Sequence, residues 1–114
     1  MHEASIAQGI IDIAQEHLRR WGLREVKSIS VRVGAATGVV VEALRFAFDA
    51  MKLDTPLEGA ELVVERVPLQ GQCLECGRPF ECWEQFVLAC PHCRSPRFRL
   101  RGGRELDVLQ MEAE

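Results

Sequence analysis

Four of the five cysteines form two closely spaced pairs, Cys73-x2-Cys76 and Cys90-x2-Cys93. Two intervening residues allow a tight turn that points both sulfurs of a pair at one centre, and a glycine after the first pair and a proline inside the second favour such turns. Four thiolates that converge in this way are the usual ligands of a tetrahedral structural zinc ion. Because the protein would fill all four coordination positions, the spacing predicts a site that stabilises the fold and is not catalytic.

The cysteines and the nearby histidine also allow other interpretations. A disulfide pair is disfavoured in a chain that we expect in the cytoplasm, and thioredoxin-like chemistry at one pair would leave the other pair without a role. His92 lies inside the second pair and could be a ligand, but we favour four sulfurs and expect His92 to point away. Cys82 is not needed for the site, and we interpret it as a half-buried apolar residue.

The N-terminus offers a second set of metal ligands. His2 follows Met1 directly, and a large second residue usually keeps the initiator methionine in place. The Met1 amine, the amide and imidazole Nδ1 of His2 and the Glu3 amide could then form a square plane, which suits Ni(II) or Cu(II). The Glu3 carboxylate could orient the imidazole or supply an oxygen ligand. From the chemistry alone, a solvated and frayed terminus is the commoner explanation of such residues.

Hydrophobic periodicity predicts the elements that must hold these ligands. Apolar residues recur at helical spacing over 5–21, where Ser5 and Gln8 fit a capping box, and again over 39–51. His17 falls one helical turn from two apolar residues of the first helix, and we interpret it as a residue at the boundary of the core. The predicted strands span residues 26–33, 62–67 and 106–111.

The composition changes between Cys73 and Cys93, where Cys, Gly, Pro and Arg replace the periodic aliphatic residues. Such a segment cannot build an ordinary hydrophobic core, and a bound metal would supply most of its folding energy, roughly 10–16 kcal/mol. We therefore expect an α/β body of residues 1–67, completed by 103–114, with a zinc-binding module at 68–102 inserted into it. The predicted fold class is α+β: a small mixed β-sheet with two helices on one face, plus this zinc-ribbon-like module with short hairpins around the cysteine pairs.

Composition and charge exclude several classes of protein. The 114 residues are 47% hydrophobic and 27% charged, which is typical of a globular chain. No apolar run approaches the roughly 20 residues of a membrane span, and the first residues do not resemble a signal peptide. We therefore expect a cytoplasmic protein without membrane contact. The net charge of −3 argues against a strongly basic nucleic-acid binder.

The charge is distributed unevenly along the chain. Residues 66–104 hold seven arginines and three glutamates, whereas the remainder holds seven basic and 14 acidic residues. Arg97, Arg99 and Arg101 alternate and would share one face of a strand. This face could dock an acidic partner, although a solvated strand face is the interpretation that we favour from the sequence.

Three segments occur together in one order: the opening MHEASIAQGIIDIA, the segment VRVGAATGVVVEALRFAF and the two cysteine pairs separated by 13 residues. In this combination the whole chain resembles the HypA family of hydrogenase maturation factors, which are nickel metallochaperones. The resemblance implies nickel at His2, with the Met1 and Glu3 backbone contributing. It also implies zinc at the following four residues: Cys73, Cys76, Cys90 and Cys93.

The resemblance further implies that nickel is delivered to the precursor of a [NiFe]-hydrogenase large subunit, together with the HypB GTPase. Two departures from the family pattern are modest. Valine stands at 41, near a position where the family often has proline, and Cys82 is not part of the family's metal pattern. Some relatives also serve urease, and nothing in these residues decides whether this chain does.

The predicted function is therefore a nickel carrier with no catalytic step. Three alternatives stay open. One is a zinc-ribbon nucleic-acid binder, supported by the arginines at 94–104 but weakened by the acidic total and the absence of tyrosine. Another is a thiol oxidoreductase, although no phosphate-binding loop or Ser/His/Asp set accompanies it. A third is a structural adaptor with zinc as its only metal. Exposed Val and Ile on a short sheet edge would also permit a homodimer.

Overall fold

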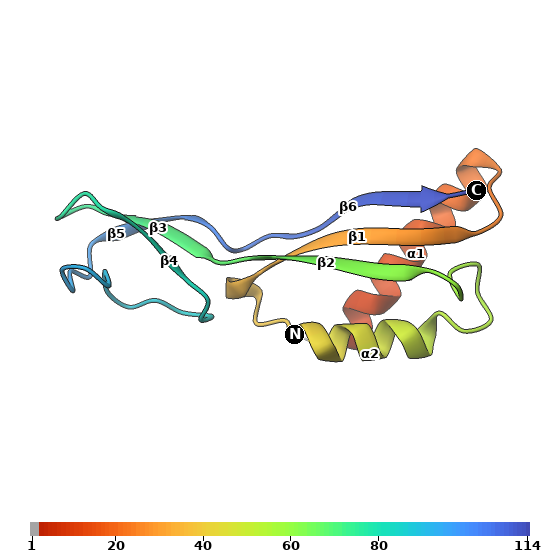
Figure 1. Cartoon of the computed structure of the whole chain (residues 1–114), viewed down its shortest axis with the longest axis horizontal. Coiled ribbons are helices and arrows are strands. Elements are labelled where there is room, and N and C mark those ends of the chain that lie inside the picture. The colour runs from red at the N-terminus through yellow and green to blue at the C-terminus, as the bar shows by residue number, and fades with distance from the viewer. Residues whose placement is uncertain (1–2) are drawn as a thin grey trace. The chain divides into compact units, whose positions relative to one another are not determined.

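A computed structural model describes residues 3–114 (Figure 1). Within these residues no helix is long and apolar enough to cross a membrane. The elements in chain order are α1 (Glu3–Trp21), β1 (Val26–Gly34), a 3-10 helix (Ala35–Thr37), α2 (Val41–Met51), β2 (Glu61–Val67), β3 (Leu69–Cys73), β4 (Pro79–Cys82), β5 (Phe98–Gly102) and β6 (Leu106–Ala113).

The chain divides into two compact units. The helical unit contains the residues up to Val31, Val39–Glu65 and Asp107–Glu114. The cysteine unit contains Arg32–Gly38 and Arg66–Leu106. Each unit has a three-stranded sheet and its own buried residues, so each is described separately.

The sheet of the helical unit has the order β2-β1-β6. The central strand β1 and its neighbour β2 run in the same direction and are joined through α2, as Figure 1 shows. β6 runs antiparallel to β1. This direction follows from a pair of backbone hydrogen bonds, 2.9 and 3.0 Å long, that Glu25 and Glu114 exchange in the antiparallel manner. The sheet is therefore mixed, and the predicted α+β class is confirmed.

Both helices and one face of β1 enclose the core of the helical unit. Ile29 and Val31 are buried and alternate with half-buried serines, so only one face of β1 is fully covered. The helices pack against each other on that face. The buried side chains that they contribute are Ala7, Ile10, Ile11, Ala14 and Leu18 from α1 and Leu44 and Phe48 from α2.

The predicted start of the first helix was wrong by two residues. α1 begins at Glu3, so Ser5 lies inside its first turn and cannot cap it, and Gln8 donates its side-chain hydrogen bond to Asp12 at 2.8 Å. An acidic residue in the first turn, next to the positive end of the helix, stabilises a helix that begins at Glu3. The predicted end is confirmed: Gly22 follows Trp21 with φ +66°, a left-handed conformation that stops the helix.

The cysteine unit is built on a second sheet of order β4-β3-β5, in which β3 pairs antiparallel with both neighbours. Its core is small. Cys73, Phe80 and Cys90 are buried, and Val87 and Phe98 pack against them. The rings of Phe80 and Phe98 meet edge to face with their centroids 5.7 Å apart. Two of the three buried residues of this cluster are thus predicted metal ligands.

The segment 32–38 also belongs to the cysteine unit. Gly34 donates a backbone hydrogen bond to Glu105 at 2.7 Å, and Ala36 donates one to Gly103 at 2.8 Å. The backbones lie so close that a Cβ atom on Gly34 would lie 2.1 Å from the carbonyl oxygen of Gly103. Position 34 therefore has to be glycine for this segment to pair as it does.

Candidate metal centre

The structure brings the four paired cysteines together at one place in the cysteine unit. All four Sγ atoms lie within 4.8 Å of one another. The sulfurs of Cys73 and Cys93 are 3.5 Å apart, and those of Cys76 and Cys90 are 3.8 Å apart. Zinc–sulfur bonds of about 2.3 Å in a tetrahedron place the sulfurs about 3.8 Å from one another. The cluster therefore fits a structural zinc ion.

Two loops of the same local structure supply the sulfurs. In the first, the backbone amides of Glu75 and Cys76 donate to Cys73 Sγ at 3.3 and 3.4 Å. In the second, the amide of His92 donates to Cys90 Sγ at 3.4 Å. Amide donors aimed at a sulfur favour the thiolate that a metal requires.

A backbone hydrogen bond closes each loop at its base. The amide of Cys73 donates to the carbonyl oxygen of Arg78 at 3.0 Å, and the amide of Cys90 donates to that of Ser95 at 2.8 Å. In both loops the residue that accepts this hydrogen bond lies five positions after the residue that donates it, so the two loops have the same length and the same closing hydrogen bond. This closure holds the two sulfurs of each pair on the same side.

The residue after each second cysteine has a left-handed backbone. Gly77 has φ +74° and Arg94, at the equivalent position of the second loop, has φ +66°. Glycine adopts this conformation freely, whereas a residue with a side chain is strained there by roughly 1–2 kcal/mol. The second loop therefore contains a strain that the first avoids.

We expect Arg94→Gly to stabilise the cysteine unit by about 0.5–1 kcal/mol, because relief of the strain exceeds the extra entropy of the unfolded chain. Urea unfolding in excess zinc measures the change in the free energy of unfolding. Gly77→Ala is the matched control and should destabilise the unit, since it introduces the same strain into the first loop. Equal destabilisation by both substitutions would contradict this explanation.

The thiols of the cluster influence one another's protonation. Hydrogen bonds from backbone amides, that of Cys76 first, lower the pKa of the Cys73 thiol to about 6. At Cys93 the amide of Ser95 lowers the pKa, but the hydrogen bond with the Cys73 sulfur and burial outweigh it and raise the pKa to about 11. These opposite shifts describe one proton held between two sulfurs. A cation is needed for all four thiols to ionise, so metal binding releases protons and weakens as the pH falls.

The cluster leaves no open coordination position for chemistry. Cys73 and Cys90 are buried, whereas Cys76 and Cys93 are exposed. The structure places His92 outside the cluster, where its Nε2 lies 3.2 Å from the carbonyl oxygen of Pro79. Metal at these four sulfurs would support the fold.

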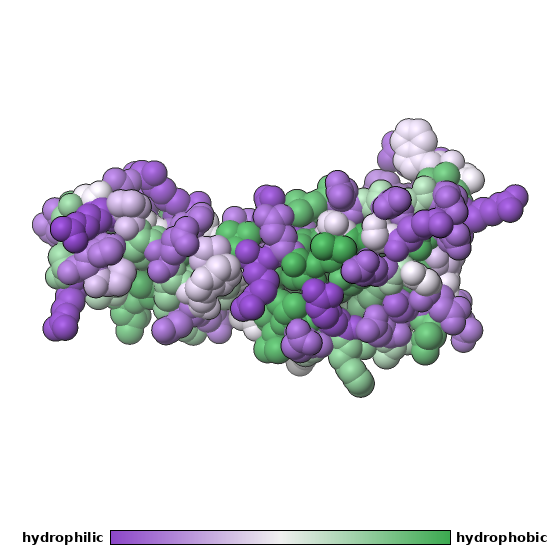
Figure 2. All heavy atoms as spheres, viewed as in Figure 1, coloured by the Kyte–Doolittle hydropathy of each residue, from purple (hydrophilic) through white to green (hydrophobic). Residues whose placement is uncertain are grey.

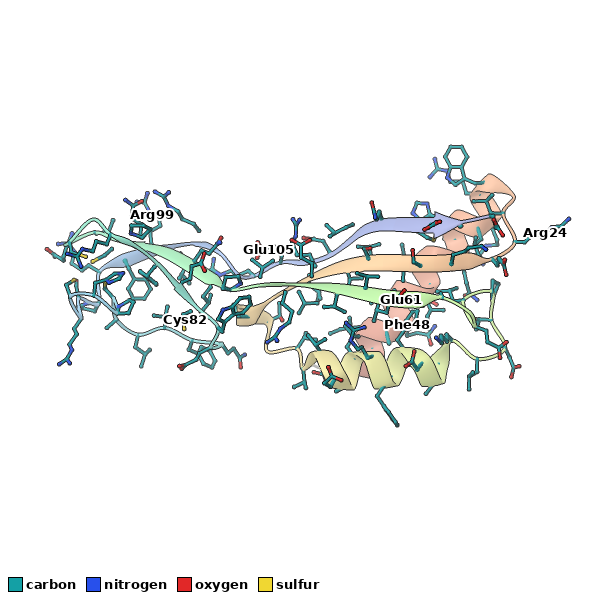
Figure 3. All side chains as sticks on the ribbon, in the orientation of Figure 1. Arg24, Phe48, Glu61, Cys82, Arg99 and Glu105 are labelled. Atoms are coloured by element: carbon teal, nitrogen blue, oxygen red, sulfur yellow. The ribbon has the colours of Figure 1, made fainter. Side chains whose placement is uncertain are left out.

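The fifth cysteine is not part of this site. Cys82 lies apart from the gathered sulfurs in Figure 3 and outside the four-cysteine cluster. It is half-buried at the end of β4, and its Sγ accepts a hydrogen bond from the Glu84 amide at 3.4 Å. This placement agrees with an apolar side chain at the edge of a core.

The predicted nickel ligands fall mostly outside the described residues: Met1 and His2 are not among them, whereas Glu3 is. The Glu3 carboxylate accepts a hydrogen bond of 2.9 Å from the backbone amide of Val40, the residue just before α2. The start of α1 is thus fixed beside the start of α2. The two partners are 37 positions apart in the chain, so no local sequence signal indicates this contact.

The prediction that His17 lies at the boundary of the core was wrong, because its side chain is exposed. It lines a groove of about 470 Å³ beside β6, together with Ile13 and Trp21 of the same helix face. Trp21 is itself 69% exposed, so this face of α1 does not enter the core. Ile13, His17 and Trp21 have the helical spacing of a buried face. The face of α1 that is buried is the adjacent one, which contains Ala7, Ile10, Ile11, Ala14 and Leu18.

The chain is similar in sequence to a known protein family and to several of its members. The family described as "Hydrogenase/urease nickel incorporation, metallochaperone, hypA" matches residues 1–113. The hydrogenase maturation factor HypA of Chlorobaculum parvum is 41% identical over 114 residues and is covered in full, as is this chain. That of Deinococcus radiodurans is 46% identical over 108 residues, covering 95% of this chain and 89% of the relative.

Solved structures agree on the fold. The solution structure of the Ni metallochaperone HypA from Helicobacter pylori superimposes with a TM-score of 0.66 at 20% sequence identity. The alignment covers 99% of this chain and 97% of that one. At this level of identity the likeness concerns the fold.

Proposed function

The chain belongs to the HypA family of hydrogenase maturation factors, and we propose that it carries Ni(II) at its own N-terminus. It is a nickel metallochaperone of hydrogenase maturation. The observation that supports this function most strongly is the family match over residues 1–113, which spans the N-terminal ligands and all four paired cysteines. Nickel is the cargo of such a protein, so the proposal concerns how the chain holds it and releases it.

The proposed nickel ligands are the Met1 amine, the amide and imidazole of His2 and the amide of Glu3. Four nitrogens in a plane suit Ni(II). An α-helix uses its amides as donors only from about the fifth residue onward, so coordination by the Glu3 amide leaves the hydrogen bonds within α1 intact. The positive end of the helix disfavours a cation, and the Glu3 carboxylate at that end offsets this effect.

The hydrogen bond between Glu3 and Val40 supports the proposed site from within the helical unit. It attaches the first residue of α1 to the chain entering α2. Protonation of the His2 imidazole or of the Met1 amine would open the chelate and release the metal. A carrier requires this combination of specific binding and easy release.

Zinc is the proposed resident metal of the four-cysteine cluster, because the distances between the sulfurs suit it. In this division of roles, the body of residues 1–67 with 103–114 carries nickel and the module of residues 68–102 holds zinc. We propose that the chain acts in the cytoplasm without a catalytic step. Its proposed partners are the HypB GTPase and the precursor of a [NiFe]-hydrogenase large subunit.

Hydrogenase maturation in cells that lack their own copy of this factor tests the proposed function. The wild-type chain and the His17→Ala variant should restore hydrogenase activity, whereas His2→Ala should not. His17 is a matched control because it is an exposed histidine of the same helical unit. Equal restoration by both variants would contradict nickel binding at the N-terminus and favour an adaptor with zinc alone.

A further inference from the structure

One face of the cysteine unit carries arginines that neither the fold nor the metal site uses. Side chains of β5 alternate between the two faces of the sheet. Phe98 and Leu100 are half-buried and pair in register with buried residues of β3, whereas Arg99 and Arg101 are exposed. The register shifts at Arg101, because Gly71 pairs with Leu100 and Gln70 pairs with Gly102. In Figure 3, Arg99 points outward from β5, away from Cys82. Arg99 and Arg101 are therefore two exposed cations on one short strand.

Most arginines of the cysteine unit have no partner within the described part of the chain. Arg97 is bound to Glu75 at 2.6 Å, and the guanidinium of Arg66 lies 5.5 Å from the ring centre of Trp83. Within residues 3–114, no hydrogen bond or ion pair holds the side chains of the following five: Arg78, Arg94, Arg99, Arg101 and Arg104. An exposed cation without a partner is available to bind an anionic group on another molecule.

The two units differ strongly in charge. The cysteine unit has eight arginines and four glutamates, whereas the helical unit has six basic and 13 acidic residues. Four thiolates with one divalent cation add about two negative charges at the cluster, so the cysteine unit stays positive. In Figure 2, hydrophilic side chains cover most of its visible surface. The cysteine unit therefore attracts an acidic molecule that the helical unit repels.

The strand that bears these arginines is also open along one edge. β5 pairs with β3 on one side, and within residues 3–114 no strand pairs with its other side. A groove of about 420 Å³ lies at the end of β5, with Arg101 and Arg104 in its lining. Glu105 also lines the groove, but its carboxylate accepts a hydrogen bond from the Gly103 amide at 2.6 Å. An open strand edge offers backbone hydrogen bonds to an extended chain.

We propose that Arg99, Arg101 and Arg104, which we name the arginine edge, bind an extended acidic segment of a partner protein. In an extended chain, carboxylates two residues apart are separated by about 6.6 Å, so two of them can reach two arginines that lie two residues apart on β5. Each guanidinium can bind one carboxylate through two parallel hydrogen bonds. The inference is independent of the proposed nickel site, because it uses only residues of the cysteine unit.

The chemistry of this face favours a peptide over a nucleic acid. Single-stranded nucleic acids bind to surfaces that offer aromatic rings for the bases to stack on. On the exposed face of β5 the side chains are arginines, while Phe98 and its partner Phe80 lie on the buried face. The acidic helical unit would also repel a long phosphate backbone.

The test measures binding of a fluorescein-labelled peptide of five Thr-Glu repeats to the zinc-loaded full chain, by fluorescence anisotropy at 50 mM salt. The double variant Arg99→Gln/Arg101→Gln should bind at least tenfold more weakly than wild type. The matched control Arg78→Gln/Arg94→Gln removes two charges from turns of the same unit and should change the affinity less than threefold. Zinc content and circular dichroism check that each variant is folded.

Three results would overturn the proposal. The first is that wild type does not bind the Thr-Glu peptide at 1 mM or binds a Thr-Gln peptide equally well. The second is that both double variants weaken binding by the same factor, which would mean that only the total charge matters. The third is that a single-stranded DNA of equal charge binds more tightly than the peptide and loses this affinity in Arg99→Gln/Arg101→Gln, which would make the face a nucleic-acid site.

Discussion

We expect that removal of the proposed zinc ion from the four-cysteine cluster unfolds the cysteine unit and leaves the helical unit folded. The buried cluster of the cysteine unit is Cys73, Phe80 and Cys90, so two of the four predicted zinc ligands also form part of its core. Structural zinc contributes roughly 10–16 kcal/mol in small domains, whereas a whole protein is stable by only about 5–15 kcal/mol. No rearrangement of so few apolar side chains can replace that contribution.

Amide NMR spectra recorded during titration with a zinc chelator measure this effect unit by unit. Signals of residues 69–102 should collapse into the unfolded range, while those of α1 and α2 keep their positions. Cys90→Ser should give the same spectrum without chelator, and Cys82→Ser, at the cysteine outside the cluster, should leave all signals in place. Dispersed signals from β3 and β4 in a sample shown to be free of metal would contradict the predicted dependence.

The second large effect concerns the core of the helical unit, in which α1 and α2 pack together. Phe48→Ala should lower the free energy of unfolding of the helical unit by about 3–5 kcal/mol, because Phe48 is fully buried and its loss leaves a cavity. The substitution also removes the contact of its ring with the Lys52 ammonium, 5.5 Å from the ring centre. A loss of this size is a large share of the stability of one small unit.

Phe46→Ala is the matched control on the same helix. Phe46 is 78% exposed, and a surface substitution of this kind changes stability by about 0.5 kcal/mol or less. Urea unfolding of zinc-loaded samples, followed by circular dichroism at a helical wavelength, measures both variants. Similar losses from the two substitutions would contradict the placement of the core on the Phe48 side of α2.

The hydrophobic periodicity of the sequence was sufficient to predict the helices and strands of the helical unit. Both helices, the strands β1, β2 and β6 and the stop at Gly22 agree with the prediction to within about two residues. These elements bury aliphatic side chains at regular spacing, which is the signal that sequence patterns carry. The spacing of the cysteines likewise predicted four sulfurs that the structure brings to one centre.

Other features depend on contacts between residues far apart in the chain. The strands of the cysteine unit are only four or five residues long, and their inward positions include Gly71 and Cys73 beside a few apolar side chains, so the alternation is too short and too weak to give their bounds. The assignment of residues 32–38 to that unit rests on backbone hydrogen bonds to Gly103 and Glu105. The start of α1 at Glu3 accompanies a hydrogen bond to Val40, and the left-handed backbone of Arg94 follows from the closure of the second loop.

Titration of Ni(II) into the zinc-loaded wild type, His2→Ala and His17→Ala tests the central claim most directly, with absorption and calorimetry as readouts. We predict one nickel per chain and a square-planar d–d band in wild type and in His17→Ala, and loss of both in His2→Ala. Because the zinc cluster is already filled, binding there cannot imitate the result. Equal nickel binding by all three proteins, or by none, would contradict the claim that this chain carries nickel at its N-terminus.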